Sequence, residues 1–379
     1  MTNKSQFWVL FFGLCFSLSH FSQPIQAQGF KDQFIDTLDH KVDLSQWLSE
    51  VYGFVPLVTL VTEPAIGYGA GGGLIFFHKR KENLTRPAPP SISMVGGLYT
   101  ESKSWGAMLL HQGIWKEDRI RYLGVLGYIS LNMTLFKELP IIGEQSFRFN
   151  MEGAFLIQQV VFRLAESNFF AGARYSFFTS ISTFLEETQL PVDPVELDMK
   201  TSALGPVLAY DGRDNTFTPN QGMYSSINYA WYHEMIGSDM NFHRVDAYWT
   251  GFAQPVSKLV LGLRADLRMT TDEAPFFAKP YVLLRGIPAM RYQSDRVVVL
   301  ETEERWDFTS RWSLVGFAGV GKAFPTFDEF SNRTLAYSVG TGFRYKIARL
   351  FNVYAGIDVA RGNEDWAFYI QFGHFWNSL

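Results

Sequence analysis

One arginine and a nearby row of carboxylates form the most specific charge pairing in the sequence. Arg285 and Gly286 lie in a long predicted loop, and the next predicted strand places Glu301 and Glu303 on its polar face. A guanidinium can donate two parallel hydrogen bonds to one carboxylate. If the loop folds inward, Arg285 pairs with such a carboxylate. If it does not, Arg285 is a solvated surface cation.

No catalytic constellation emerges from the sequence. The 7 histidines are scattered without metal-ligand spacing, and there is no G-x-S-x-G motif. His78, His111, His233 and His243 lie on different predicted elements, with no evident serine partner. A Ser-His triad would have to be assembled in space. We therefore expect no enzyme activity, no metal and no cofactor, and we keep a hydrolase as the least favoured alternative.

A glycine-rich segment matches the pattern G-x-G-x-x-G from Gly67 to Gly72. That pattern binds dinucleotides only where it joins a strand to a helix. Here the apolar residues 74–77 continue the segment as a strand. The glycines are therefore predicted to allow bending or close approach of neighbouring backbones, not nucleotide binding.

The N-terminus has the features of a secretory signal peptide. Lys4 precedes an apolar run over residues 7–18, and small and polar residues follow up to Ala27. The only cysteine, Cys15, lies inside that run after Leu14, which argues against a lipidation site. Cleavage of residues 1–27 would leave a chain without thiol or disulfide chemistry.

Charge and aromatic content narrow the class of protein. The chain has 33 Lys+Arg against 37 Asp+Glu, so it lacks the basic excess that nucleic-acid binding requires. After the N-terminal run, no apolar stretch is long enough for a membrane helix. Aromatic residues make up 16% of the chain, with 32 glycines. An ordinary soluble core does not need this many aromatic residues.

The rest of the chain alternates between apolar and polar residues. In segments 259–270, 337–347 and 351–359, apolar side chains occupy every second position and polar side chains the positions between them. Successive side chains of a strand point to opposite faces, so each segment has one apolar and one polar face. Either a soluble sandwich or an outer-membrane barrel produces this pattern.

Three features favour the barrel. The predicted strands are about 10 to 13 residues long, enough for a tilted strand to cross a bilayer. Aromatic residues cluster at their ends, as in interfacial girdles. Polar faces carry both charge signs, as at Arg264, Asp266 and Arg268, and a lumen can pair such charges. We predict an all-β fold, a transmembrane antiparallel β-barrel in the bacterial outer membrane.

Sixteen strands are predicted, an even number, as in bacterial single-chain barrels. They span residues 55–62, 66–78, 92–100, 102–115, 119–131, 149–162, 169–180, 202–211, 223–234, 241–252, 256–270, 296–308, 311–323, 334–346, 350–361 and 365–376. With both termini periplasmic, long outer loops should follow the fifth, seventh, eleventh and thirteenth strands. The inner turns, at residues 116–118, 165–168, 254–255 and 348–349, should be short, and the long segment 79–91 on the periplasmic side is an exception without an explanation.

Several motifs occur together in the order found in one family. Asp211, Arg213, Asp214 and Asn215, followed by Pro219 and Gly222, resemble a D-x-R-D-N…P…G turn. Leu284-Arg285-Gly286 resembles a V-R-G-F/Y loop motif, Glu303 matches an acidic position on the following strand, and residues 316–321 resemble the next strand's signature. Residues 368–376, with Tyr369, Phe372, Gly373 and Trp376, resemble a C-terminal insertion signal. The chain is thus similar to the BamA/TamA-type outer-membrane barrels, the bacterial surface antigen family.

The resemblance has departures. Ile287 replaces the family's usual aromatic residue, and Gly319 stands where many members have an aspartate that also holds the loop arginine. The arginine lock should therefore rest on Glu303 alone. Trp376 replaces the usual terminal phenylalanine. Residues 28–51 are too few for the POTRA domains that capture client proteins, so we expect only a short periplasmic segment before a barrel over residues 52–379.

The resemblance implies a role in outer-membrane protein or lipid assembly or transport. In this family the first and last strands pair weakly, so the barrel can open sideways. The implied partners are outer-membrane lipid, the barrel-assembly machinery for the chain's own insertion, and client outer-membrane proteins. A passive pore or a structural barrel is the alternative.

Overall fold

The computed structural model describes residues 34–36, 38–45, 54–78, 90–139, 143–185, 195–271 and 273–376. The predicted signal peptide lies outside these residues, as does much of the segment that follows it. Within the described residues, no helix has the length and hydrophobicity needed to cross a bilayer.

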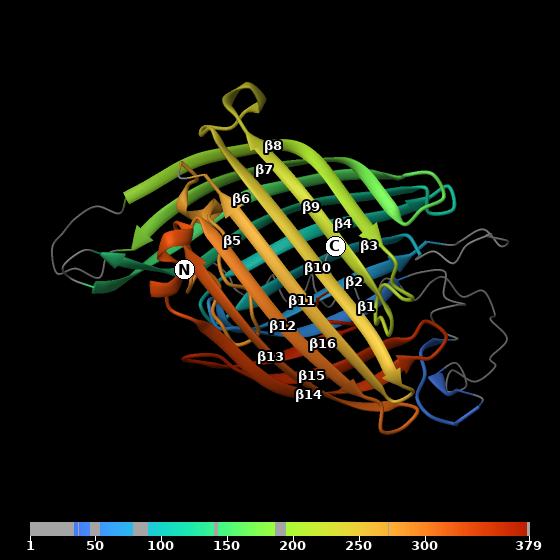
Figure 1. Ribbon diagram of the computed structural model, residues 1–379. Helices are drawn as coiled ribbons and strands as arrows, with labels where there is room; N and C mark the ends of the chain where they lie inside the picture. The colour runs from blue at the N-terminus through green and yellow to red at the C-terminus, as the bar shows by residue number, and fades with distance from the viewer. Residues whose placement is uncertain are drawn as a thin grey trace, which may run out of the picture.

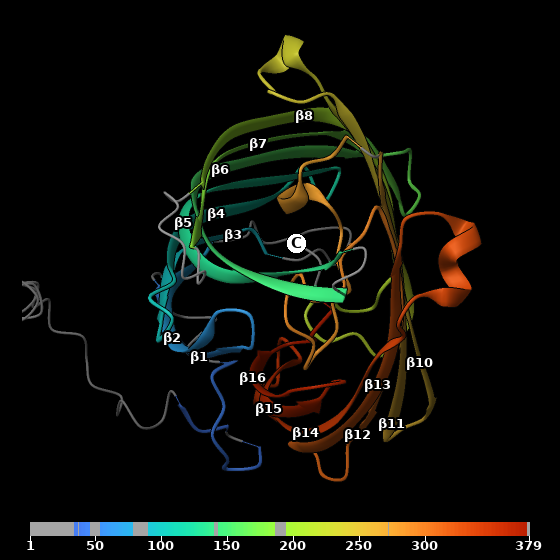
Figure 2. The ribbon, with the colours of Figure 1, turned by 90° about the vertical axis from the view of Figure 1, so that its left-hand side faces the viewer.

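The described residues form one antiparallel sheet of sixteen strands in sequence order, which confirms the predicted fold class and strand number (Figure 1). The sheet curls into a barrel, as the view in Figure 2 shows. The strands are β1 (Phe54–Glu63), β2 (Gly67–Phe77), β3 (Ile92–Thr100), β4 (Trp105–Trp115), β5 (Ile120–Leu139), β6 (Gly143–Arg163), β7 (Phe169–Leu185), β8 (Val195–Asp211), β9 (Gly222–Tyr232), β10 (Phe242–Val256), β11 (Leu259–Thr270), β12 (Arg296–Trp306), β13 (Trp312–Phe324), β14 (Ala336–Ala348), β15 (Val353–Arg361) and β16 (Trp366–Phe372).

The period-two pattern places apolar side chains on the outer wall and charged side chains in the lumen. On β12, Leu300 is 54% exposed on the outer wall, whereas Glu301 and Glu303 are buried on the other face. The same outward exposure recurs around the barrel, at Leu126, Ile227, Leu263, Leu314 and Val339. A sheet with this polarity suits an apolar surrounding better than water.

The two ends of the barrel differ in their connections. One end, here called the short-turn end, carries tight turns such as 116–118, where Lys116, Glu117 and Asp118 all have positive φ. The other, the long-loop end, carries three short 3₁₀ helices, η2 (Glu234–Ile236), η3 (Phe276–Ala278) and η4 (Phe327–Asn332). Strands β5 to β8 extend furthest at the long-loop end (Figure 1).

Strands β5 to β8 are longer than the pattern predicted. Pairing of β5 with β6 continues from Leu131↔Met151 out to Leu139↔Gly143, so most of the loop expected after residue 131 is strand. The pairing of β7 with β8 likewise reaches Phe184↔Val195. Each added pair satisfies backbone hydrogen-bonding groups, and no tight-turn signal interrupts the chain there.

The barrel has a seam where its first and last strands meet. Strands β1 and β16 lie next to each other (Figure 2), yet no ladder joins them among the described residues. Beside the seam, Gly69 and Gly73 of β2 let the backbone of β3 approach closely. A Cβ atom on Gly69 would lie 2.3 Å from the Tyr99 carbonyl oxygen, and one on Gly73 would lie 2.6 Å from that of Val95.

Candidate functional site: a charged cluster in the lumen

The connection between β11 and β12 folds into the lumen. In Figure 2 it appears in orange inside the ring of strands. Val282, Leu284 and Ile287 are buried against Val297 and Val299 of β12, and this apolar contact holds the connection inside. The burial of these side chains positions the arginine between them.

Arg285 is fully buried, with 0% exposure, and faces three carboxylates. Its guanidinium lies 2.9 Å from Glu301 Oε1, 2.7 Å from Glu303 Oε2 and 2.8 Å from Asp358 Oδ2. Glu301 and Glu303 are two positions apart on β12, and Asp358 comes from β15. The expectation that Glu303 alone holds Arg285 is therefore wrong.

Gly319, where the resemblance would place an aspartate, has no room for a side chain. A Cβ atom on Gly319 would lie 2.6 Å from Leu284 Cδ2 and 3.1 Å from Glu301 Cγ. The inward-folded loop and Glu301 thus fill the space that a side chain on residue 319 would need. Asp358 supplies a carboxylate from another strand instead.

The face of the Arg285 guanidinium, the Arg285 carbonyl oxygen and the N–H of the neighbouring Gly286 also have partners. The guanidinium carbon lies 3.4 Å from the centre of the Phe317 ring and 4.7 Å from that of Phe375, a cation–π arrangement on both rings. The Ser338 hydroxyl donates to the Arg285 carbonyl oxygen. Gly286 has φ +81°, a conformation that favours glycine, and its N–H donates to the Tyr369 hydroxyl at 2.8 Å.

The cluster extends through two further arginines. Glu301 Oε2 accepts from Arg264 Nη1 at 2.8 Å, and Arg264 also pairs with Asp266. Asp358 pairs with Arg344 of β14 as well as with Arg285. Because each buried charge has an opposite partner, the large cost of an isolated buried charge is avoided. The network joins β11, β12, β14 and β15 to the lumen loop.

The C-terminal segment enters the same cluster. Strand β16 ends at Phe372, and Gly373, with φ +76°, turns the chain into the lumen. Trp376 is 4% exposed, and its indole N–H donates to Glu301 Oε2 at 2.7 Å. His374 Nε2 lies 3.2 Å from Glu303 Oε1.

The predicted last strand, which ended at Trp376, is therefore too long. Tyr369 points into the lumen, Phe372 is 41% exposed on the outer wall, and Trp376 is buried inside. The residues predicted to form the insertion signal thus lie on two faces. Their reading by an assembly machinery stays a prediction.

The predicted turn motif lies at the short-turn end and does not touch Arg285. Asp211 pairs with Arg213 at 2.9 Å and with Arg121 at 2.7 Å. Asp214 Oδ1 accepts the backbone N–H groups of residues 220 and 221, and Asn215 Oδ1 accepts those of residues 217 and 218. These bonds close the connection from β8 to β9.

That connection supports the C-terminal segment. The Phe217 carbonyl oxygen accepts from the His374 backbone N–H at 2.8 Å, and Asn215 Nδ2 donates to the Phe351 carbonyl oxygen at 3.1 Å. The turn motif therefore acts on the charged cluster indirectly, through the chain that carries His374 and Trp376.

A second buried arginine, Arg311, lies at the short-turn end, where the segment before the barrel docks. It is 1% exposed and pairs with Asp36 at 2.5 Å, with Asp39 at 2.6 Å, and with Asp43. The hydrogen bond from Arg311 lowers the pKa of Asp39 to about 2. Arg349 also pairs with Asp36 and lowers its pKa. No pattern in the sequence predicted this docking.

Asp358 is the carboxylate that was not predicted beside Arg285, whereas Glu301 was predicted on the same polar face as Glu303 but without a role in the lock. Both occupy polar positions in alternating strands, which was the available signal. Asp358 is separated from Arg285 by 73 positions, so only the closed barrel reveals the contact. Within the described residues, no three His, Cys, Asp or Glu side chains are arranged to hold a metal ion.

Comparison with known proteins identifies the fold. No protein-family model and no curated protein sequence matches this chain. BamA from Haemophilus ducreyi lacking POTRA domains 1–3 is similar in structure, with a TM-score of 0.56 and 13% identity over 86% of this chain and 70% of that chain.

CdiB from Escherichia coli has a TM-score of 0.56 and 9% identity over 85% of this chain and 62% of that one. CdiB from Acinetobacter baumannii has a TM-score of 0.55 and 10% identity over 84% of this chain and 59% of that one. At these identities the likeness shows a shared barrel fold.

Proposed function

We propose that this chain is an outer-membrane barrel that assists the assembly or transport of outer-membrane proteins or lipids, with the short-turn end and both termini on the periplasmic side. The apolar outer wall supports a membrane location, because lipid is the surrounding that suits it. Similarity in fold to BamA and CdiB supports the same class of protein.

The seam between β1 and β16 is the observation that carries the proposal. Every other neighbouring pair of strands is joined by a ladder in the described residues. A strand edge without a partner can pair with another chain by strand addition. In a bilayer, unpaired backbone groups cost several kcal/mol each, so such an edge favours either transient opening or capture of a client strand.

The filled lumen argues against a wide passive pore. The connection from β11 to β12 and residues 373–376 occupy space inside the ring, held by the cluster around Arg285. We propose that this lock keeps the lumen arranged while the seam moves.

The test is the folding rate of a second, unfolded barrel protein added to liposomes that contain the purified chain. Cysteine pairs are placed across the seam on outward positions of β1 and β16, such as Leu60 and Phe368, and a pair that is shown to cross-link on oxidation closes the seam. The matched control pair is Leu314→Cys with Phe343→Cys, which are directly opposite each other on outward positions of β13 and β14. The predicted mature chain has no other cysteine.

We expect acceleration over empty liposomes that oxidation of the seam pair abolishes and reduction restores. Oxidation of the control pair should leave the acceleration unchanged. Acceleration that persists with a closed seam would exclude strand capture at the seam. Correctly folded protein that gives no acceleration would favour a pore or structural barrel, and single-channel conductance would then separate these two.

A further inference from the structure

A chain of polar side chains lies on the outer wall near the short-turn end. His78 Nε2 lies 2.7 Å from Ser93 Oγ, and Ser93 Oγ lies 2.8 Å from His111 Nδ1. His78 directly follows β2, Ser93 is on β3 and His111 is on β4. No serine partner for these histidines is evident in the sequence, but the pairing of β3 with β4 places Ser93 opposite His111.

Two aromatic rings and an amide lie next to this row of polar side chains, and together they are here called the rim. The rings of Trp115 and Tyr122 stack with centres 5.5 Å apart, and the Tyr122 hydroxyl donates to Gln158 Oε1. Each ring lies close over a glycine. A Cβ atom on Gly113 would lie 2.6 Å from Trp115, and one on Gly124 would lie 2.5 Å from the Tyr122 hydroxyl. The rings can therefore lie against the wall instead of projecting from it.

An apolar groove of about 430 Å³ continues from the rim toward the middle of the wall. Phe76, Val95, Leu109 and Leu126 line it, together with Ser93, His111, Tyr122 and Gln158 at its polar end. Leu109 and Leu126 are 54% and 51% exposed, so the groove opens outward and not into the lumen. The arrangement is amphipathic along the strand direction.

We propose that this groove binds one phospholipid, with its phosphate at His78, Ser93 and His111 and an acyl chain along Leu109 and Leu126. The proposal rests on the membrane location given under the proposed function. There the short-turn end lies at the level of one layer of head groups, and the groove below it lies at the level of the acyl chains. The ring nitrogens that do not face Ser93, His78 Nδ1 and His111 Nε2, can donate to a phosphate diester when they carry a proton, while Ser93 holds the two rings side by side.

A catalytic role for His78, Ser93 and His111 has less support than lipid binding. Among the described residues neither histidine pairs with a carboxylate, and a Ser-His nucleophile is normally oriented by such a group.

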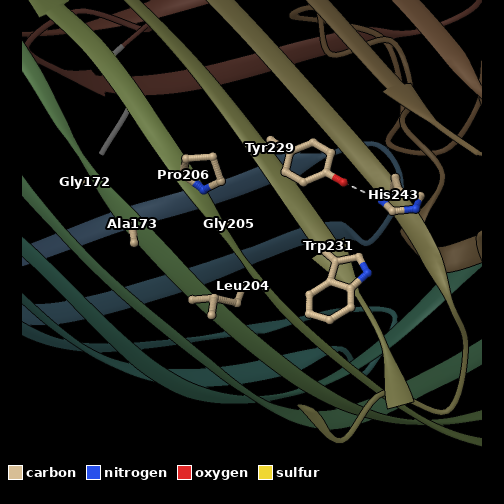
Figure 3. A pocket seen from close by; sticks show the side chains of 8 residues that line it. All are labelled: Gly172, Ala173, Leu204, Gly205, Pro206, Tyr229, Trp231 and His243. Carbon is tan, nitrogen blue, oxygen red and sulfur yellow. Dashed lines mark hydrogen bonds between the residues drawn. The ribbon is translucent and has the colours of Figure 1, made fainter. Parts of the chain in front are cut away.

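A groove at the opposite end of the wall provides an internal comparison. It is lined by Leu204, Pro206, Tyr229, Trp231 and His243, and Tyr229 hydrogen-bonds His243 at 2.7 Å (Figure 3). It has one histidine and no serine in its lining. His243 therefore offers a matched histidine on the outer wall, outside the proposed head-group site.

The experiment titrates detergent-solubilised, folded protein with phosphatidylglycerol and counts retained lipids by native mass spectrometry. We expect one lipid to remain on the wild-type chain. The double variant Ser93→Ala with His111→Gln should bind it about tenfold more weakly, as expected when hydrogen bonds to a charged group are lost. His243→Gln should bind it as the wild type does. Heat-modifiable migration checks that each variant is folded.

A second variant keeps the test decisive if the double variant does not fold. Leu126→Trp fills the groove without touching the rim and should also weaken lipid binding. In a separate competition experiment, inorganic phosphate should not displace the lipid from the wild-type chain. Folded wild-type protein that retains no lipid, or equal loss in His243→Gln, would overturn the proposal. Release of fatty acid by wild type but not by Ser93→Ala would replace it with a hydrolase.

Lipid binding and the folding assay fail independently. A chain that accelerates client folding but retains no lipid contradicts only the lipid site. A chain that retains the lipid but gives no acceleration contradicts only the assembly role.

Discussion

Arg285 and Arg311 are both buried and both face three carboxylates, yet they are built in opposite ways. Around Arg285, the carboxylates Glu301, Glu303 and Asp358 belong to strands, and the arginine comes from a loop. Around Arg311, the arginine precedes a strand, and the three aspartates belong to the segment before the barrel.

The difference decides what each arginine can hold. Strand carboxylates cannot leave the lumen, so losing Arg285 would remove the cation that Glu301, Glu303 and Asp358 share and leave an excess of buried negative charge in the cluster. The aspartates at Arg311 can return to water together with their segment. The first cluster should therefore determine the stability of the barrel, and the second only the docking of residues 34–45.

The largest effect is expected for Arg285→Ala. Breaking buried pairs by removing one partner costs about 3–5 kcal/mol, so the variant should be strongly destabilised or fail to assemble. Urea unfolding and heat-modifiable migration measure this. Arg291→Ala is the control in the same loop, because Arg291 pairs with the half-exposed Glu364 and should cost much less. Unchanged migration and unchanged levels for Arg285→Ala would contradict the lock.

Glu301→Gln should destabilise the barrel more than Glu303→Gln, by on the order of 1 kcal/mol. Glu301 accepts from Arg264, Arg285 and the Trp376 indole, whereas Glu303 lies beside Arg285 and His374. Urea midpoints of the two variants, measured side by side, test the order. An equal or reversed order would mean that the network does not centre on Glu301.

Arg311→Ala should release the N-terminal segment while the barrel stays folded. The measurement is limited proteolysis of residues 34–45, with urea unfolding as the check on the barrel. Arg119→Ala is the control at the same end, because Arg119 and Glu166 are 64% and 61% exposed. A segment that stays protected in Arg311→Ala would show that other contacts hold it, such as the Tyr345 hydroxyl to the Val42 carbonyl oxygen.

The smallest effect is expected on the docking of the N-terminal segment when the pH is lowered. The pKa of Asp39 falls from 3.8 to about 2 through the hydrogen bond from Arg311, so docking favours the ionised form. This contribution is fully present above pH 3.8 and is lost as the pH falls toward about 2. Cleavage of the segment by pepsin should rise over that range in the wild type. In Arg311→Ala it should already be high and change little. Equal pH dependence in both would contradict the assignment.

Alternation along the chain predicted much of the fold. Each strand's inner and outer faces follow from residues two positions apart, so sixteen strands and a charged lumen could be inferred locally. Strand ends were less predictable. Strands β5 to β8 run on because pairing continues without a tight-turn signal, and β16 ends early because Gly373 adopts a positive φ. The sequence shows which residues favour a turn, but it does not show how far the pairing between two strands continues.

The contacts of the charged cluster also differ in whether the sequence could predict them. The pairing of Arg285 with a carboxylate on the next strand could be anticipated, since loop and strand are neighbours in sequence. Asp358 could not, because β15 meets the loop only when the barrel curls and the loop folds inward. Arg311 with Asp36, and Ser93 with two histidines, depend equally on register and docking. The local pattern decides which face a charge occupies, whereas only the closed barrel decides which charges meet.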